Sequence, residues 1–541
     1  MTPDQEEKSQ NNTDTTEEKN KSTGHENTRY QSSTKRIAKN TLMLYFRQIL
    51  ILLVSLYTVR VVLNTLGAED YGIYNVVAGV VTMFSFLSGA MATASQRYFA
   101  FEMGKGNEEG LQKVFSVTMT IYVFLALVIV VLAETVGLWF VNTRLVIPAQ
   151  RMMAAQWIYQ FAILSFMVTL LTTPYMASII AHENMNVYAY VSIAEAALKL
   201  GIVFVLRVLP YDKLIVYGAL LLLVACINTG LYRGYCKRRY AECRFRLLWD
   251  RALFTELVSY SGWNLFGASV GIVKNQIINI LLNLFFGPLV NAARAVSAQV
   301  NSAVVSFSQN FSTAMRPQII KNYAAENYEE TMRLIFRGCK GTFFLMYLFA
   351  LPLMIEMPYV LKLWLKEPPE MLVLFTRLAL LDALIDSISY PIMTLTQATG
   401  KIKLYQGVVG GVLLLNLPVS YCALRLGAPA YSVMIIAAVI TLLAFIIRLC
   451  IVRHLAKLSL VQFVTKTALP VLAVAVCAGA LPVMVNGSLA QGMLRLCVTV
   501  VISCCSTAFF VWFIGLSGEE RASVSSMIRK KLQNNFQEKK C

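Results

Sequence analysis

The residues of this sequence with the strongest potential for chemistry are charged side chains placed inside long apolar segments. Each costs roughly 2.5–3.5 kcal/mol at the centre of a membrane-spanning helix, so such residues usually have a function. Lys274 is the clearest case, and Asn275, Asn279 and Asn283 follow it with a four-residue spacing among themselves. This spacing places the three amides on one face of a helix. The pattern predicts a polar stripe that lines a water-filled cavity, and hydrogen bonding between helices is the alternative.

Four arginines also lie within the predicted membrane segments, near their ends: Arg47, Arg60, Arg294 and Arg377. Arginine near a helix end can reach the membrane surface, so position alone does not require a ligand. A guanidinium group binds oxyanions through paired hydrogen bonds, and lysine supplies a point charge. We therefore expect a cavity for an anionic substrate, lined by Arg47, Arg60, Lys274, Arg294, Asn275 and Asn279.

Acidic residues in the apolar segments form two further patterns. Glu195 and Lys199 stand four residues apart with the acid first, which favours an ion pair within a helix. Asp382 and Asp386 have the same spacing but like charges, so one must be protonated, paired or bound to a cation. The candidates for coupling to H+ or Na+ are Asp382, Asp386, Arg377, Glu195 and Lys199. Structural ion pairs with Lys199, Lys274 or Arg377 are the alternative.

The elements that position these residues are predicted from composition. Hydrophobic residues make up 57% of the 541 residues and charged residues only 14%, against roughly 25% charged in globular domains. We expect an all-α integral membrane protein with about fourteen transmembrane helices, in two six-helix bundles and a C-terminal pair. The expected spans are 41–66, 74–101, 114–140, 154–181, 187–209, 214–232, 253–286, 290–311, 334–357, 371–397, 405–424, 431–451, 467–485 and 496–516.

A basic stretch at residues 233–251 separates the two bundles and is too charged to enter a bilayer. Lys and Arg are also enriched in every second connection, as is typical of cytoplasmic loops. The predicted parts are a disordered N-terminal tail (1–40), an N-terminal lobe (41–232), a cytoplasmic linker (233–252), a C-terminal lobe (253–452), two added helices (453–516) and a C-terminal tail (517–541). Both termini are expected in the cytoplasm.

The two lobes are predicted to be an internal repeat with an offset of 220 residues. Matching residues include Gly67 and Gly287, Ser88 and Ser308, and Asn107 and Asn327. Six spans per lobe is an even number, so the lobes share one orientation and are related by an axis along the membrane normal. We expect a substrate cavity between them.

Several other functions are disfavoured by the sequence. Its three histidines, His25, His182 and His454, lack the spacing of a zinc site, so no metal or other cofactor is expected. No G-x-x-x-x-G-K-[ST] loop is present, so the chain is not its own ATPase. The net charge of +18 has no soluble domain that would present it to nucleic acid. We expect a transporter and not an enzyme.

With this architecture, the opening KRIAKNTLMLYF and the following VVLNTLGAEDYGIYNVV resemble the multidrug, oligosaccharidyl-lipid and polysaccharide flippase superfamily, most closely its bacterial polysaccharide transporters. Leu66, Gly67 and residues 70–74 look like the first outer loop of that family. The resemblance implies that two rocking lobes move an undecaprenyl-diphosphate-linked oligosaccharide to the outer leaflet of the bacterial plasma membrane. The product would serve O-antigen, capsule or exopolysaccharide synthesis, alongside polysaccharide polymerases and glycosyltransferases.

Two alternatives remain open. A cation-coupled drug exporter of the same superfamily is disfavoured by the two added C-terminal helices and by the basic excess among the intramembrane charges. A membrane-embedded polysaccharide polymerase or glycosyltransferase would need a substantial catalytic loop outside the membrane. The longest outer connections, residues 141–153 and 358–370, lack a cluster of acids, histidines and nucleophiles.

The first prediction concerns topology. A reporter fused at Asn142 or Gly487 should report the outer side and one at Lys237 the inner side, because basic segments are retained in the cytoplasm. The activity of a reporter that is active on only one side of the membrane checks each position. A reversed result at any of the three would contradict the fourteen-span arrangement.

Overall fold

The computed structural model describes residues 36–526, apart from residues 56, 59–60, 63–64, 83, 144–146, 247–249, 366–370 and 523. These residues form helices and no strand, which confirms the all-α class. Within this described part, eleven helices are long and apolar enough to cross a membrane. Most of the predicted N-terminal tail, up to residue 35, and the C-terminal tail from residue 527 lie outside the described residues. Residues 36–40, expected in the tail, instead begin the first helix, Arg36–Ser55.

The other helices follow in two series. The first is α2 (Ala68–Thr82), α3 (Ser85–Lys105), α4 (Glu108–Leu132), α5 (Leu138–Thr143), α6 (Met152–Ala181), α7 (Met185–Val208) and α8 (Lys213–Arg239). The second is α9 (Arg251–Ala324), α10 (Tyr328–Leu365), α11 (Leu372–Ser387), α12 (Ser389–Thr399), α13 (Ile402–Leu414), α14 (Asn416–Arg425), α15 (Ser432–Ala456), α16 (Leu460–Phe463), α17 (Leu469–Ser488) and α18 (Met493–Phe510). The expected linker is partly helical, because α8 continues to Arg239.

Three of the fourteen expected spans are helical in the structure, but none of the three forms a separate long apolar helix. Span 74–101 is divided between α2 and α3, and span 371–397 between α11 and α12. Span 290–311 lies in the second half of α9, after a kink at Gly287. These three spans account for the difference between fourteen expected spans and the eleven helices.

Proline explains two helix breaks that hydropathy did not predict. Pro391 has no N–H to donate to the carbonyl of Ser387, the last residue of α11. Pro418 likewise leaves the carbonyl of Leu414 without a donor, and α13 ends there. Both prolines lie in apolar runs, so the breaks leave the hydropathy of the segments unchanged.

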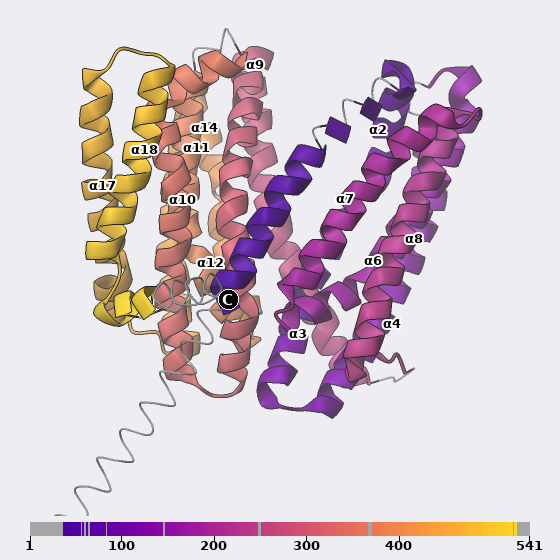
Figure 1. The fold of residues 1–541 in the computed structure, drawn as a ribbon, viewed down its shortest axis with the longest axis horizontal. Helices are drawn as coiled ribbons and strands as arrows, with labels where there is room; N and C mark the ends of the chain where they lie inside the picture. The colour runs from indigo at the N-terminus through magenta and orange to yellow at the C-terminus, as the bar shows by residue number, and fades with distance from the viewer. Residues whose placement is uncertain are drawn as a thin grey trace, which may run out of the picture.

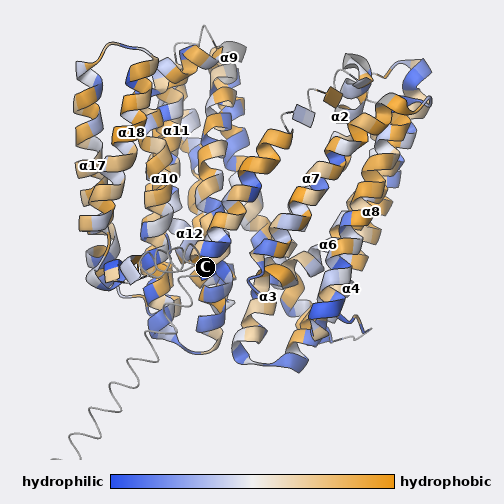
Figure 2. Ribbon diagram, in the orientation of Figure 1, coloured by the Kyte–Doolittle hydropathy of each residue, from blue (hydrophilic) through white to orange (hydrophobic). Residues whose placement is uncertain are grey.

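The helices form two groups that lie side by side, α2–α8 in one and α9–α18 in the other (Figure 1). We call these the N-terminal and the C-terminal lobe. Their ribbons approach each other at the lower end of the view and diverge at the upper end, and helix Arg36–Ser55 runs obliquely between them. Apolar residues cover the middle of both lobes, while polar residues gather at the lower connections (Figure 2). The limits of the domains stay predictions, because neighbouring helices alone do not define units that fold separately.

The backbone repeats itself at the predicted offset of 220 residues. Left-handed conformations occur at Gly67 (φ 85°) and Gly287 (φ 78°), and again at Gly106 (φ 68°) and Glu326 (φ 59°). The residues that follow the second pair, Asn107 and Asn327, each cap the next helix by accepting a hydrogen bond from the N–H three residues later, at 2.9 and 3.3 Å. The sequence repeat therefore corresponds to a structural repeat.

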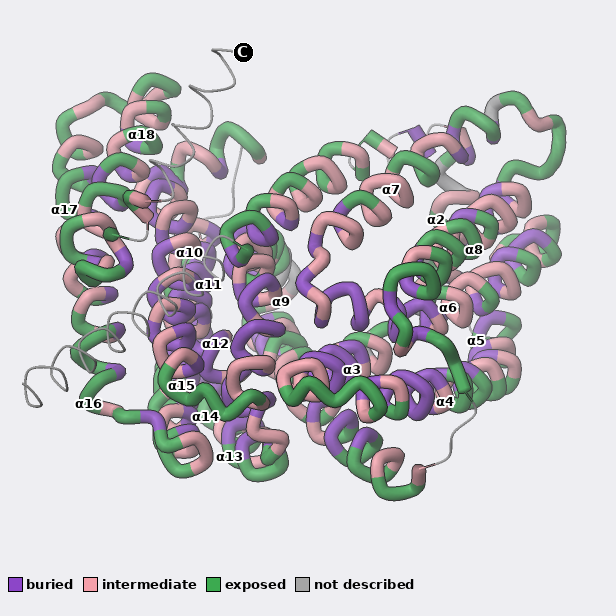
Figure 3. Tube along the Cα trace, turned by 60° about the horizontal axis from the view of Figure 1, so that its bottom comes forward, coloured by how far each residue is buried: buried purple, intermediate pink, exposed green. Residues whose placement is uncertain are grey.

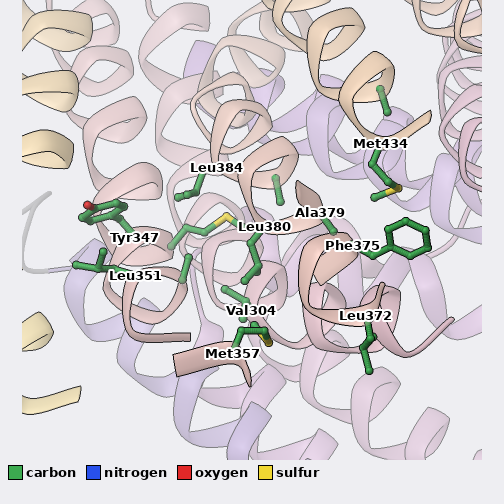
Figure 4. Close-up of a cluster of buried hydrophobic side chains, with 14 of the residues drawn as sticks. Val304, Tyr347, Leu351, Met357, Leu372, Phe375, Ala379, Leu380, Leu384 and Met434 are labelled. Atoms are coloured by element: carbon green, nitrogen blue, oxygen red, sulfur yellow. The ribbon is translucent and has the colours of Figure 1, made fainter. Parts of the chain in front are cut away.

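The C-terminal lobe has an apolar core to which α9, α10, α11, α14, α15 and α17 contribute, and Figure 4 labels side chains from four of these helices. Buried side chains in it include Val304, Tyr347, Phe375, Leu380 and Met434. Helix α17 packs against the same core, and the outer faces of α17 and α18 remain exposed (Figure 3). An exposed apolar face on the outside of a membrane protein contacts lipid.

Two buried ion pairs tie the C-terminal helices to α10. Glu356 is fully buried and accepts a hydrogen bond from Arg495 Nη2 at 3.0 Å, and Asn486 also donates to it. At the other end of α10, Lys340 Nζ lies 2.6 Å from the carboxylate of Glu520. The helix pair is therefore fixed at both ends, although the apolar contacts alone would allow it to slide.

The second prediction tests this attachment. Glu356→Ala should lower the free energy of unfolding by about 3–5 kcal/mol, because it leaves Arg495 buried without its carboxylate. Thermal unfolding of the purified protein in detergent measures the change, and Glu109→Ala, at an exposed position, is the control. Equal unfolding midpoints for Glu356→Ala and Glu109→Ala would contradict the role of Glu356 in attaching α17 and α18 to α10.

Candidate functional site

The two lobes are joined at one end by a buried carboxylate. Glu183 lies in the turn between α6 and α7, and its side chain is 4% exposed. It accepts hydrogen bonds from Lys321 Nζ and Gln318 Nε2 of α9, both at 2.9 Å. The backbone carbonyl of Glu183 also accepts a hydrogen bond from Asn40 Nδ2 at 3.0 Å, which ties in the first helix. Three separate segments therefore meet at this residue, which we call the latch.

The charges around the latch keep Glu183 ionised. Burial by itself would raise the pKa of Glu183, but Lys321, Gln318 and Arg36 outweigh the burial and hold it below the usual value of 4.5. An acid whose pKa is lowered by folding stabilises the contact above its ordinary pKa. That stabilisation is lost only as the pH falls through the lowered value, so the latch is fully formed at neutral pH.

A second contact joins the lobes through a cation on the other side. Arg97 of α3 donates to the backbone carbonyls of Gln397 and Ala398 in α12, at 3.1 and 3.3 Å. Its guanidinium also lies 4.4 Å from the ring centre of Tyr98 and 5.5 Å from that of Tyr260 in α9. Arg97 thus contacts both lobes, and in the described part of the chain its guanidinium forms no ion pair with an acid.

Residues at matching positions of the two repeats contact each other between these two ties. Arg316 donates to Gln96 at 3.3 Å, and these positions differ by the repeat offset. Gly104 matches Ala324 in the same way, and a Cβ atom on Gly104 would lie 2.8 Å from Cβ of Ala324 and 2.5 Å from a carbonyl oxygen of Lys321. Equivalent residues touch only beside the symmetry axis, so the pseudo-twofold axis passes between α3 and the second half of α9.

A cavity of about 470 Å³ lies between the first helix and helices of the N-terminal lobe. Arg47 of the first helix lines it, with its guanidinium 4.6 Å from the ring centre of Tyr188. Glu195 and Lys199 form the predicted ion pair at 2.6 Å, and Asn228 donates to Glu195 at 3.0 Å. The cavity brings together three of the predicted site residues: Arg47, Glu195 and Lys199.

The C-terminal lobe contains a separate cluster. Lys274 Nζ lies 3.3 Å from the carboxylate of Asp382 and donates to Thr441 at 2.8 Å. Arg294 is buried and donates to Asn275 at 3.3 Å. Lys274 is therefore bound within its own lobe and lies in a different lobe from Arg47. Asp386 has a partner of its own, Arg448, at 2.8 Å, and Arg60 lies outside the described residues. Asn279 is half-buried on α9.

Arg377 contacts neither cluster. Its Nε donates to the carbonyl of Met354 at 2.7 Å and its second nitrogen to that of Ile355 at 3.3 Å. Pro358 of α10 has no N–H to donate to Met354, so Arg377 supplies the missing hydrogen bond. Ser506 does the same for Ala478, whose carbonyl Pro482 leaves free, at 3.0 Å. These contacts account for Arg377 without an ion.

Arg448, Glu183 and Arg97 belong to these sites but were not predicted from the sequence. Arg448 lies near the end of an expected span but well inside α15, which continues to Ala456. Glu183 lies in the one inside connection without Lys or Arg, and that absence was the available signal. Arg97 stands in an expected span that is divided in the structure, and no pattern distinguished it from a basic residue near a helix end.

The third prediction concerns the latch. Glu183→Gln should separate the lobes at this end, because a neutral amide binds Lys321 less strongly than a carboxylate does. Electron–electron distance measurements between spin labels at positions 109 and 329, both exposed, should give longer distances. Glu242→Gln is the matched control, since Glu242 pairs with His182 at 2.6 Å beside the latch but within the N-terminal half. Equal distances in both variants would contradict the latch.

Comparison with known proteins agrees with this architecture. Residues 37–323 match the family described as polysaccharide biosynthesis protein. No curated protein sequence matches the chain. Similar solved structures include an outward-facing multidrug resistance MATE family transporter of the MOP superfamily, with TM-score 0.67, and a MATE in its bent conformation, with TM-score 0.68. Each has 12% identity and covers 79% of this chain and 96% of its own.

A MOP superfamily transporter from Pyrococcus furiosus is similar to the same extent, with TM-score 0.65, 12% identity and the same coverage of both chains. At this identity the structures show a common fold. The family match covers more than half of the 541 residues. The chain therefore belongs to the polysaccharide biosynthesis protein family and has the fold of MOP superfamily transporters.

Proposed function

We propose that this protein is a membrane transporter, and specifically a flippase for a lipid-linked oligosaccharide, carried on undecaprenyl diphosphate, in the bacterial plasma membrane. The observation that carries the proposal is the uncompensated charge in the N-terminal cavity. Glu195 and Lys199 neutralise each other at 2.6 Å, and within the described part of the chain no ion pair is formed by Arg47. The cavity therefore keeps one net positive charge.

Arg47 is half-buried within a membrane segment, where an unpaired charge is costly, so its retention favours an anionic ligand. The Nε of Arg47 is buried and has no hydrogen-bond partner among the described residues. Phosphate oxygens are the acceptors that a guanidinium binds best. The serine and threonine hydroxyls in the same lining, from Ser55 to Thr173, are suited to sugar hydroxyl groups.

The proposed direction of transport follows from charge. The latch and the connections between α3 and α4 and between α9 and α10 lie at the end where the lobes meet. Basic residues of α8 also end its last turn, at residues 237–239. Assigning this end to the cytoplasm places both termini inside, and the lobes then diverge toward the outer leaflet. The head group would enter after the latch opens and leave when it closes again.

The fourth prediction tests the ligand. Arg47→Glu should abolish export of the surface polysaccharide while the protein remains inserted, because it reverses the charge offered to the diphosphate. Arg47→Lys should keep part of the activity, since it retains the charge but loses the paired hydrogen bonds. Surface polysaccharide on cells that carry only the variant is the measurement.

The matched control is Arg425→Glu, which reverses an exposed arginine at the end of α14. This variant should export normally. Full export by Arg47→Glu, at a protein level equal to that of the wild type, would contradict the proposed role of the cavity.

Coupling to H+ or Na+ through Asp382 and Asp386 is a separate hypothesis, and we favour the structural alternative. Each acid already faces a cation of the chain, Lys274 at 3.3 Å and Arg448 at 2.8 Å. An acid neutralised by a lysine or arginine has no need of a proton or a metal cation.

The fifth prediction separates these hypotheses by exchanging charges. Lys274→Asp should destabilise the protein by placing two acids together, and the double variant Lys274→Asp with Asp382→Lys should restore both folding and transport. Protein yield and transport at several values of pH and Na+ concentration are the measurements. A folded double variant that transports but no longer responds to pH or Na+ would instead support coupling at Asp382.

A further inference from the structure

A second, smaller cavity lies between the lobes, apart from the one that contains Arg47. Its volume is about 240 Å³. Gly89 and Thr93 of α3 line it on one side, and residues of α9, α12, α13 and α15 line it on the other. Because both lobes contribute to the lining, the cavity is complete only when the lobes are in contact.

Four buried side chains in this lining have polar atoms without a hydrogen-bond partner among the described residues. They are the Nδ2 atom of Asn264, the Oε1 atom of Gln397, the hydroxyl of Tyr405 and the Nε of Arg448. These residues are only 6%, 5%, 2% and 8% exposed. Unpaired polar atoms in a protein interior are costly, so a lining of this kind is suited to a polar molecule that pairs with them.

The charge of the lining decides which polar molecule fits. Arg448 is its one charged residue within the described part of the chain, and its NH1 donates to Asp386 at 2.8 Å. The site is therefore close to neutral, which disfavours a phosphate or a metal cation. Its free groups are two donors, one acceptor and one hydroxyl that does both, and this combination matches the hydroxyl groups of a sugar.

We propose that this cavity binds one uncharged sugar residue of the transported glycan. A sugar hydroxyl donates to Gln397 Oε1, and others accept from Arg448 and pair with Tyr405. The volume equals that of about eight liquid waters at ~30 Å³ each, which suits a single sugar ring. This inference rests on the proposed function, because it takes the ligand to be part of the lipid-linked oligosaccharide.

The site also has a direct connection to the contact between the lobes. The side chain of Gln397 lines the cavity, while its backbone carbonyl accepts the hydrogen bond from Arg97 Nε at 3.1 Å. A sugar held between α3 and α12 adds contacts across the same interface. Bound sugar therefore stabilises the arrangement in which this end is closed.

Saturation-transfer NMR tests the proposal on the purified full-length protein in detergent micelles. The probes are glucose, galactose and N-acetylglucosamine, each added separately. At least one should bind the wild type, and Tyr405→Phe should weaken that binding about tenfold, as expected for one lost hydrogen bond. Gln397→Met, a second variant of similar size, should weaken it as well. Tyr122→Phe, which removes a buried hydroxyl from α4 of the other lobe, should bind like the wild type.

The proposal is overturned if none of the three sugars binds, or if Tyr405→Phe and Gln397→Met bind as tightly as Tyr122→Phe. Displacement of the sugar by inorganic phosphate would also overturn it, because the site would then be an anion site. Its failure differs from failure of the proposed function. A protein that moves lipid-linked oligosaccharide without binding free sugar loses only this site, whereas sugar binding without export of polysaccharide contradicts the flippase.

Discussion

The whole arrangement depends on how closely α3 approaches the second half of α9. At position 104 a single additional carbon would lie 2.5 Å from a carbonyl oxygen of the opposite helix, so only glycine allows the two backbones to meet. The contact lies on the pseudo-twofold axis and is flanked by Glu183 on one side and Arg97 on the other. Two lobes that touch along one line can rock about it. Ties on both sides of that line then decide which end is closed.

The two ties differ in chemistry although they occupy related places. Glu183 brings a charge that neighbouring cations hold ionised, whereas Arg97 binds backbone carbonyls and aromatic rings. An anionic head group competes with Glu183 for Lys321, and it offers the Arg97 cation a charged acceptor in place of the backbone carbonyls. Both ties therefore give an anionic substrate a charge on which to act.

Much of the fold followed from the sequence, because its signals are regular. Apolar length predicted the helices, and the 220-residue offset predicted an internal repeat, which the structure shows in matching positive φ values. The breaks near Pro391 and Pro418 were not predicted, since proline changes hydrogen bonding without changing hydropathy.

The site was predicted only in part. Spacing along one helix identified the pair Glu195 and Lys199. It was silent on contacts between helices, so it grouped Lys274 with Arg47 although they lie in different lobes. Arg377 shows a further limit of sequence-based prediction. It donates to a carbonyl that lacks its usual helical donor because of a proline on another helix. In a membrane interior a buried cation pairs with a ligand, with an acid or with a free backbone carbonyl. Only the three-dimensional structure shows which of these partners a given cation has.

The most direct test of the account uses the purified chain in vesicles that contain a defined undecaprenyl-diphosphate-linked oligosaccharide. The measurement is the rate at which the sugar becomes accessible to a glycosidase that cannot cross the membrane. The account predicts that the chain accelerates this movement over protein-free vesicles and does not accelerate it for an uncharged glycolipid with the same sugar. Equal rates with and without the protein, or equal acceleration of the uncharged glycolipid, would contradict it.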